Sequence, residues 1–306
     1  MYFEKIPLYT QSLNSPIDKN SLLQLVYEQD YYNGSDQMGL PFKYEKDFWL
    51  TVILGIMSQK FPEVVFKGGT CLNKVYYPQF RMSEDLDFVY NNIYNLNTNS
   101  RDVRSNILNE CFEKLQTFMV DLGFVFANKK DENGKQRFKH NESRNGIFIY
   151  EYESVIDGSI QTIKIDIIVG PEILKPLVLW SVTSAFNCFN SIQMSCYDII
   201  EMLAEKMKAA LCRKGPAIRD YYDIWYAYSI AGFDFSTNEY MELLIQKLKS
   251  DNFLYTFNQP WAYENLLKQI EKDLYPVLLE GSDTNFSLED SYIFVSNFCL
   301  TPNIEM

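Results

Sequence analysis

The spacing of hydrophobic positions changes along the chain, and each change predicts a different kind of element. Apolar residues recur at helical spacing in 44–59 and 101–123, and Gly123 is placed to end the second helix. Short apolar runs predict strands at 85–90, 124–127, 146–153 and 160–170.

A further strand is predicted at 63–69, EVVFKGG, and it ends in a glycine turn. The next residues, TCLNKVYY, are expected to open a short helix with Thr70 as its N-cap. The polar segment 128–145 is expected to be a hairpin loop between two strands.

The pattern becomes helical in the second half of the chain. Segments 197–214 and 217–232 are strongly periodic, and helices are expected to continue to about Phe298. An α/β part followed by an α-helical part predicts two domains, with a boundary between about 176 and 196. We assign 1–185 to an α/β domain with N-terminal helices, and 186–306 to an α-helical domain.

Length and composition fit this division. The chain has 306 residues, of which 47% are hydrophobic, enough for two modest packed domains or one large one. No apolar run is long enough to span a bilayer, and the N-terminus does not resemble a signal peptide. The six scattered cysteines form no CxxC pair, which favours reduced thiols. We expect a cytoplasmic protein without a membrane partner.

Charge and histidine content exclude two classes of site. A net charge of −12 argues against a protein that coats nucleic acid through a general basic surface. A local basic cleft could still come from segments 128–144 and 205–219. The single histidine, His140, rules out a His-rich zinc site.

Two carboxylates stand in the predicted strand 85–90. Because side chains alternate between the faces of a strand, Asp85 and Asp87 share one face, while Leu86 and Phe88 point into a core. Two adjacent carboxylates repel, and their burial needs a compensating cation. Mg²⁺ supplies that charge and leaves positions for phosphate oxygens. A solvated strand end is the alternative.

A third carboxylate, Asp166, lies in IKIDIIV with Ile165 and Ile167 on the opposite face. Aspartate is a poor strand former, so its presence in a β-branched run suggests a functional role. If this strand lies beside 85–90, three carboxylates meet at one end of the sheet. Such a trio suits phosphoryl-group chemistry, with metal ligands and a further ligand or base that activates a hydroxyl. A plain sheet-edge aspartate is the alternative.

The glycine turn points to the same chemistry. Gly68 and Gly69 let backbone N–H groups approach a phosphate, since no Cβ intervenes. Thr70 begins a helix whose first amides attract an anion. Arg81 and Ser83 lie just before the aspartate pair, and Arg81 could neutralise a phosphate charge. A tight turn without a ligand is the alternative for the glycines.

A second charged cluster belongs to the helical half. Lys206 and Arg213 are seven residues apart, two helical turns, and should share a face. Arg219, Asp220 and Asp223 lie on the next predicted helix. A cation on such a face can hold a triphosphate, and Asp223 could orient it through a salt bridge. A solvated lysine and a structural Arg219–Asp220 ion pair are the alternatives.

These segments together resemble a known family. KGGT followed ten residues later by RMSEDLDF, then IKIDII, then EKMKAALCRKGPAIRDYYDIW, looks like the motif series of the AbiEii/AbiGii nucleotidyltransferase-like toxins. The match spans about residues 64–228. Family members are toxins of bacterial type IV toxin–antitoxin and abortive-infection pairs. The resemblance implies the polymerase-β-like nucleotidyltransferase fold, with a mixed sheet and a C-terminal α-helical domain, and a cognate antitoxin.

The resemblance also implies roles for residues. Asp85, Asp87 and Asp166 would form an acidic triad that binds Mg²⁺ or Mn²⁺, and they would act in catalysis together with Lys206 and Asp223. Ser83 matches a serine that is phosphorylated in some relatives as a means of restraint, although a structural or phosphate-contact role is favoured here. Nucleotide and phosphate binding would fall to Lys67, Gly68, Gly69, Thr70, Arg81, Ser83, Arg213, Arg219 and Asp220.

The predicted activity is transfer of a nucleoside monophosphate from an NTP to an acceptor hydroxyl. Some relatives modify the 3′ end of tRNA, so an RNA 3′ end, with tRNA first, is the expected acceptor. Two other classes stay open. One is a protein-modifying phosphotransferase, either a kinase or a nucleotidylating enzyme, or a phosphohydrolase. The other is a non-catalytic nucleotide-binding protein of the same fold.

Overall fold

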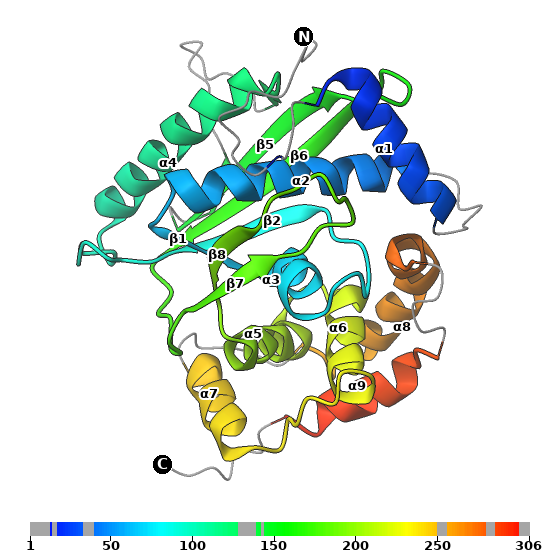
Figure 1. Ribbon diagram of the computed structural model, residues 1–306. Coiled ribbons are helices and arrows are strands. Elements are labelled where there is room, and N and C mark those ends of the chain that lie inside the picture. Colours follow the sequence, from blue (N-terminus) through cyan, green and yellow to red (C-terminus); the bar gives the residue numbers. More distant parts are fainter. Residues whose placement is uncertain are drawn as a thin grey trace. The chain divides into compact units, whose positions relative to one another are not determined.

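A computed structural model describes residues 13, 17–32, 40–127, 139–141, 144–249, 256–279 and 285–299. The chain divides into two compact units, Met1–Tyr197 and Asp198–Met306. Figure 1 shows the helices and strands of both, and each unit is described here by itself.

The first unit is built on a mixed sheet of eight strands. Its order is β3-β5-β6-β2-β1-β8-β7, and β4 pairs with β5 outside this path. The β2–β6 and β1–β8 pairs are parallel and the other pairs are antiparallel. The bounds are β1 Val64–Lys67, β2 Asp85–Tyr90, β3 Val125–Phe126, β4 Lys139–Asn141, β5 Asn145–Glu153, β6 Ile160–Val169, β7 Val178–Val182 and β8 Ile192–Cys196.

Four α-helices of the described residues accompany this sheet: α1 Lys19–Tyr32, α2 Leu40–Lys60, α3 Gly68–Cys71 and α4 Arg101–Asp121. A π-helical turn, η1 Leu72–Tyr76, continues α3. The predicted helices 44–59 and 101–123 are confirmed as α2 and α4. After α4 the chain turns at Gly123, whose φ of +85° lies in the left-handed region.

One face of the sheet carries the core of this unit. Leu86, Ile165 and Phe148 are register partners across β2, β6 and β5, and all are fully buried. Phe112 of α4 stacks on Phe148 with 6.1 Å between ring centroids. Trp49 of α2 packs near Tyr152 of the same β5 face. Helices α2 and α4 therefore cover this face, and odd-numbered residues of β2 point to the other one.

The second unit is helical in its described residues, as the sequence predicted. Its elements are α5 Ile199–Cys212, α6 Ile218–Ser229, α7 Asn238–Lys249, α8 Pro260–Gln269, the π-helical turn η2 Ile270–Leu274, the 3₁₀ turn η3 Tyr275–Val277 and α9 Leu288–Ser296. Asp198 caps α5 by accepting from the Ile200 N–H at 2.8 Å. Of the helices described in either unit, none has the length and apolar character needed to cross a bilayer.

Several expectations about element positions need correction. Helix α3 begins at Gly68, so Thr70 is not its N-cap. Lys139–Asn141 is a strand within the segment expected to be a loop; residues 128–138 and 142–143 of that segment lie outside the described residues. The units divide after Tyr197, whereas the boundary expected at 185/186 falls in the β7–β8 connection. Strands β4, β7 and β8 had all escaped prediction.

A buried ion pair holds η1 against α2. The Lys74 ammonium is 2.8 Å from Asp47 Oδ1 and donates to Thr51 Oγ1 at 2.9 Å, and the Lys74 side chain is only 2% exposed. On its other side the Lys74 carbonyl accepts from both the N–H and the hydroxyl of Thr183, each at 2.7 Å. The turn directly after the glycines is thus fixed from two directions.

Replacing Lys74 with Met is expected to lower the free energy of unfolding by about 3–5 kcal/mol, because Asp47 is left as an uncompensated buried charge. Urea unfolding of the full chain measures the loss. Lys46→Met is the control, since Lys46 pairs at 3.6 Å with Glu84, whose side chain is 41% exposed. This control should cost less than about 1 kcal/mol. Equal losses in the two variants would contradict the assignment.

Candidate active site

The acidic pair lies at the start of β2, on the face opposite the core. Leu86 and Phe88 are fully buried beneath the helices, whereas the Asp85 side chain is 45% exposed. Asp87 shares the face of Asp85 and is partly buried. The prediction that Asp85 and Asp87 share one face while Leu86 and Phe88 point into the core is therefore confirmed.

Asp166 lies beside this pair. Strands β2 and β6 run parallel, with Asp87 opposite Asp166 and Asp85 opposite Lys164. Register partners on adjacent strands project from the same face at a strand spacing of about 4.8 Å. The three carboxylates therefore meet on one face of the sheet, as expected if the two strands were neighbours.

Lys164 is a member of this cluster that the sequence analysis missed. Its Nζ lies 2.9 Å from Asp166 Oδ2 and 3.5 Å from Asp85 Oδ2. The signal was present in IKIDII, because a residue two positions before Asp166 must share its face.

The charges of the cluster act on each other. Burial raises the pKa of Asp87; the Lys67 and Lys164 cations lower it, while Asp166 and Asp85 raise it further. Burial likewise raises the pKa of Asp166, against the hydrogen bond from Lys164. Burial lowers the pKa of Lys164, but the bond to Asp166 and the three carboxylate charges leave it above its ordinary value. Asp87 and Asp166 are therefore costly to ionise unless a cation lies beside them.

The glycine turn lies against this cluster. Gly68 has a φ of +80°, and a Cβ built there would be 2.2 Å from Asp87 Oδ2. A Cβ at Gly69 would be 2.6 Å from the Arg81 Nη2. Only glycine permits both the backbone angle at the first position and the close approach of the Asp87 carboxylate.

Side chains behind the turn hold it to β2. The Thr70 hydroxyl is fully buried, 2.8 Å from Ser83 Oγ, and it also bonds to the Asp85 carbonyl oxygen. Arg81 is 2% exposed and donates from Nη1 to the Met82 carbonyl at 3.0 Å. These contacts are structural, so phosphate binding by the Thr70 and Arg81 side chains stays a prediction.

The cluster has donors that fit a hard divalent cation. Carboxylate oxygens are the preferred ligands of Mg²⁺. The Asp166 Oδ1 is buried and has no hydrogen-bond partner in the described part of the chain. As these side chains stand, however, no group of three or more acidic, cysteine or histidine side chains among the described residues is arranged to hold a metal ion. Lys164 provides the positive charge instead.

The second unit has a separate ionic cluster. Lys206 of α5 lies 2.9 Å from both Asp220 Oδ1 and Asp223 Oδ2 of α6, so the expected salt bridge to Asp223 is present. Arg213 contacts Asp220 Oδ2 at 2.8 Å. Helix α5 ends at Cys212 and Arg213 is its C-cap residue. Lys206 and Arg213 nevertheless both reach the Asp220 carboxylate, as expected of two residues on one side of the helix. Arg219 is partly exposed.

Two segments, 128–144 and 205–219, were expected to supply a basic cleft, and the structure describes only the second of them in full. Most of 128–144 lies outside the described residues. Within 205–219, Lys206 and Arg213 are paired with Asp220, and Lys208 donates to the Lys247 carbonyl at 2.8 Å. Much of its positive charge is therefore used inside the second unit.

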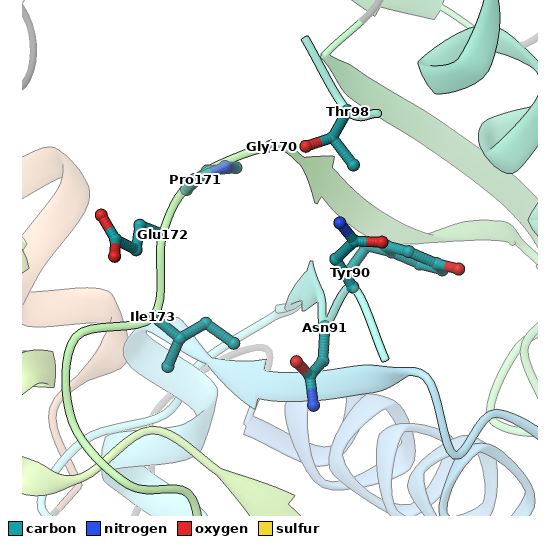
Figure 2. Close-up of a pocket in the computed structure, with 8 residues that line it drawn as sticks. Tyr90, Asn91, Thr98, Gly170, Pro171, Glu172 and Ile173 are labelled. Carbon is teal, nitrogen blue, oxygen red and sulfur yellow. The ribbon is translucent and has the colours of Figure 1, made fainter. Parts of the chain in front are cut away.

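A cavity of about 290 Å³ lies at the other end of β2 and is distinct from the acidic cluster. Tyr90, the last residue of β2, lines it together with Asn91, Thr98, Gly170 and Glu172, as Figure 2 shows. Asp85 is the first residue of the same strand, so the cavity and the acidic pair are at opposite strand ends.

Gly68→Ala is expected to lower the free energy of unfolding by about 3 kcal/mol or more, since a left-handed backbone angle and an overlap with Asp87 both oppose the methyl group. Gly232→Ala separates the two effects, because Gly232 has a φ of +69° but no neighbour within 4 Å. That control should cost only about 1–2 kcal/mol. Urea unfolding measures both, and equal costs would mean that the contact with Asp87 carries no weight.

Lys206→Met is expected to cost about 3–5 kcal/mol of stability, because Asp220 and Asp223 would keep buried charges without their shared cation. Arg213→Ala is the matched control, since Arg213 also pairs with Asp220 but is 52% exposed, and it should cost less than about 1 kcal/mol. Chemical denaturation followed by circular dichroism gives both values. A stable Lys206→Met protein would show that the lysine is not structural.

Comparison with known proteins identifies the family to which this chain belongs. Solved structures with a similar chain path include JHP933 from Helicobacter pylori, which is 17% identical and covers 84% of this chain and 89% of that one, with a TM-score of 0.46. A candidate nucleotidyltransferase from H. pylori is 15% identical, covers 84% and 92%, and has the same TM-score of 0.46. No curated protein matches. The family model described as "Nucleotidyl transferase AbiEii toxin, Type IV TA system" matches residues 53–290, so the chain belongs to the AbiEii family of nucleotidyltransferase toxins.

Proposed function

We propose that this protein transfers a nucleoside monophosphate from an NTP to an acceptor hydroxyl, with Asp85 and Asp87 as ligands of a divalent cation. The observation that carries the proposal is the register of β2 and β6, which puts Asp166 beside Asp87 on one sheet face. Family membership supports a nucleotide substrate and a cognate antitoxin.

The reaction is an in-line displacement at the α-phosphorus. The acceptor oxygen forms a bond to that phosphorus, the bond to the bridging oxygen breaks, and pyrophosphate leaves with both electrons of that bond. When bound, Mg²⁺ or Mn²⁺ would neutralise the charge that develops on the phosphoryl oxygens. Asp166 completes the acidic set. Its Oδ1, which has no hydrogen-bond partner among the residues that the structure describes, would serve either the cation or the proton of the attacking hydroxyl.

Groups around the turn are suited to the nucleotide phosphates. Lys67 is the register partner of Asp87 on β1, and its ammonium lies 5.5 Å from the centre of the Tyr197 ring. The backbone of Gly68 and Gly69 has no Cβ to keep a phosphate away. The family motif also implies that Lys206 and Arg219 contact the nucleotide phosphates. We keep this as a separate proposal, because Lys206 already neutralises two carboxylates.

The proposed acceptor is an RNA 3′ end, with tRNA as the first candidate. With a net charge of −12, the protein must repel RNA over most of its surface. RNA should therefore bind at a restricted basic rim, and this binding should be salt-sensitive but local.

Asp87→Asn is expected to reduce transfer about 10²-fold or more, because it removes a charged ligand that is worth several kcal/mol in the transition state. The assay incubates the full chain with total RNA, Mg²⁺ and an NTP labelled at the α- or γ-phosphate. Glu84→Gln is the control, since Glu84 adjoins the pair in sequence but forms a surface ion pair with Lys46.

The label separates the candidate activities. Label from the α-phosphate on RNA supports nucleotidyl transfer, and α-label on protein supports a protein nucleotidylating enzyme. Label from the γ-phosphate on protein would indicate a kinase-like enzyme. Growth arrest on expression that persists unchanged in Asp87→Asn would indicate a non-catalytic protein and would overturn the proposal.

A further inference from the structure

We propose that Lys164 is the resident counter-cation of the acidic cluster, and that a divalent cation must displace its ammonium group in order to bind. The inference rests on the proposed function, because it concerns the same carboxylates. It adds a residue outside the acidic trio that sets how readily the site accepts its metal ion.

The position of the lysine carries the argument. Lys164 stands opposite Asp85 in the β2–β6 register, and it lies two residues before Asp166 on β6. Its Nζ is 2.9 Å from Asp166 Oδ2 and 3.5 Å from Asp85 Oδ2, so one ammonium group bridges carboxylates of two strands. A cation shared by these carboxylates would need the same place.

An ammonium group and a metal ion cannot occupy that place together. Like charges at such a short distance repel strongly, and a divalent ion doubles the repulsion that a singly charged group would exert. Lys164 already lies against one oxygen of Asp85 and one oxygen of Asp166, so a metal ion shared by these two oxygens would meet the ammonium group there. Metal binding therefore requires Lys164 to leave.

The lysine is able to leave. Its side chain is 36% exposed, and the Asp85 side chain is 45% exposed, so the pair borders solvent rather than a sealed interior. A flexible four-carbon stem lets the ammonium group swing into water without a backbone change. Free metal ions should consequently bind weakly to the native chain.

Mn²⁺ titration of the full chain without nucleotide, followed by electron paramagnetic resonance, tests the competition. Lys164→Met is expected to bind Mn²⁺ at least tenfold more tightly than the native chain. Lys46→Met removes a lysine from another carboxylate pair and should leave the affinity unchanged. Lys164→Met with Asp87→Asn should lose the gain. Equal or weaker binding by Lys164→Met overturns the inference.

A second measurement uses the native chain and does not depend on the folding of a variant. Acetylation of lysines by an amine-reactive reagent, read by mass spectrometry, should rise at least threefold at Lys164 when Mn²⁺ is added, while Lys46 stays constant. Unchanged acetylation of Lys164 at saturating Mn²⁺ overturns displacement.

These outcomes separate the two proposals. If native and Lys164→Met chains bind Mn²⁺ equally well, only the role of Lys164 fails. If neither chain binds Mn²⁺, both the counter-cation and the metal ligands of the proposed function fail.

Discussion

The parallel register between β2 and β6 is the constraint on which the site depends. It places Asp87 opposite Asp166 and Asp85 opposite Lys164, so four charged groups share one patch of the sheet. A shift of one residue would turn the side chains of β6 to the other face. Asp166 would then point into the core and Ile165 and Ile167 would point outward. The fully buried isoleucines beneath α2 and α4 therefore fix the charged face as firmly as they fix the core.

The same constraint explains why the glycine turn is built as it is. Asp87 reaches Gly68 so closely that no side chain fits between them. The turn must then be held without side chains of its own, and its neighbours do this. Thr70 bonds back to the start of β2, while Lys74 fixes the following π-helical turn to Asp47 of α2. The buried ion pair between Lys74 of η1 and Asp47 of α2 thus supports the backbone of the turn that faces the carboxylates.

Much of this arrangement could be predicted from sequence where a period was strict. Alternation along DLDFVY and IKIDIIV assigned the faces of Asp85, Asp87 and Asp166, and the helical periods gave α2, α4 and α5. Strand β7 was missed because it is an edge strand with Leu179 67% and Trp180 49% exposed, so it shows no buried alternation. The spacing of Lys164 from Asp166 does place it on the acidic face. Its contact with Asp85, like that of Lys74 with Asp47, depends on which elements become neighbours, and the sequence does not reveal this.

Lys74, Lys206 and Lys164 each contact carboxylates, and the difference in their burial separates their roles. Lys74 with Asp47 is 2% exposed, and Lys206 is 14% exposed between carboxylates that are 5% and 0% exposed. Removing either cation would leave charge in a place that water cannot reach, so both are fixed parts of the structure. Lys164 is 36% exposed, so water can solvate its charge and that of Asp85 once they part. The ion pairs of Lys74 and Lys206 therefore fix the structure. At Lys164, on the face where the carboxylates meet, another cation can take the place of the ammonium group.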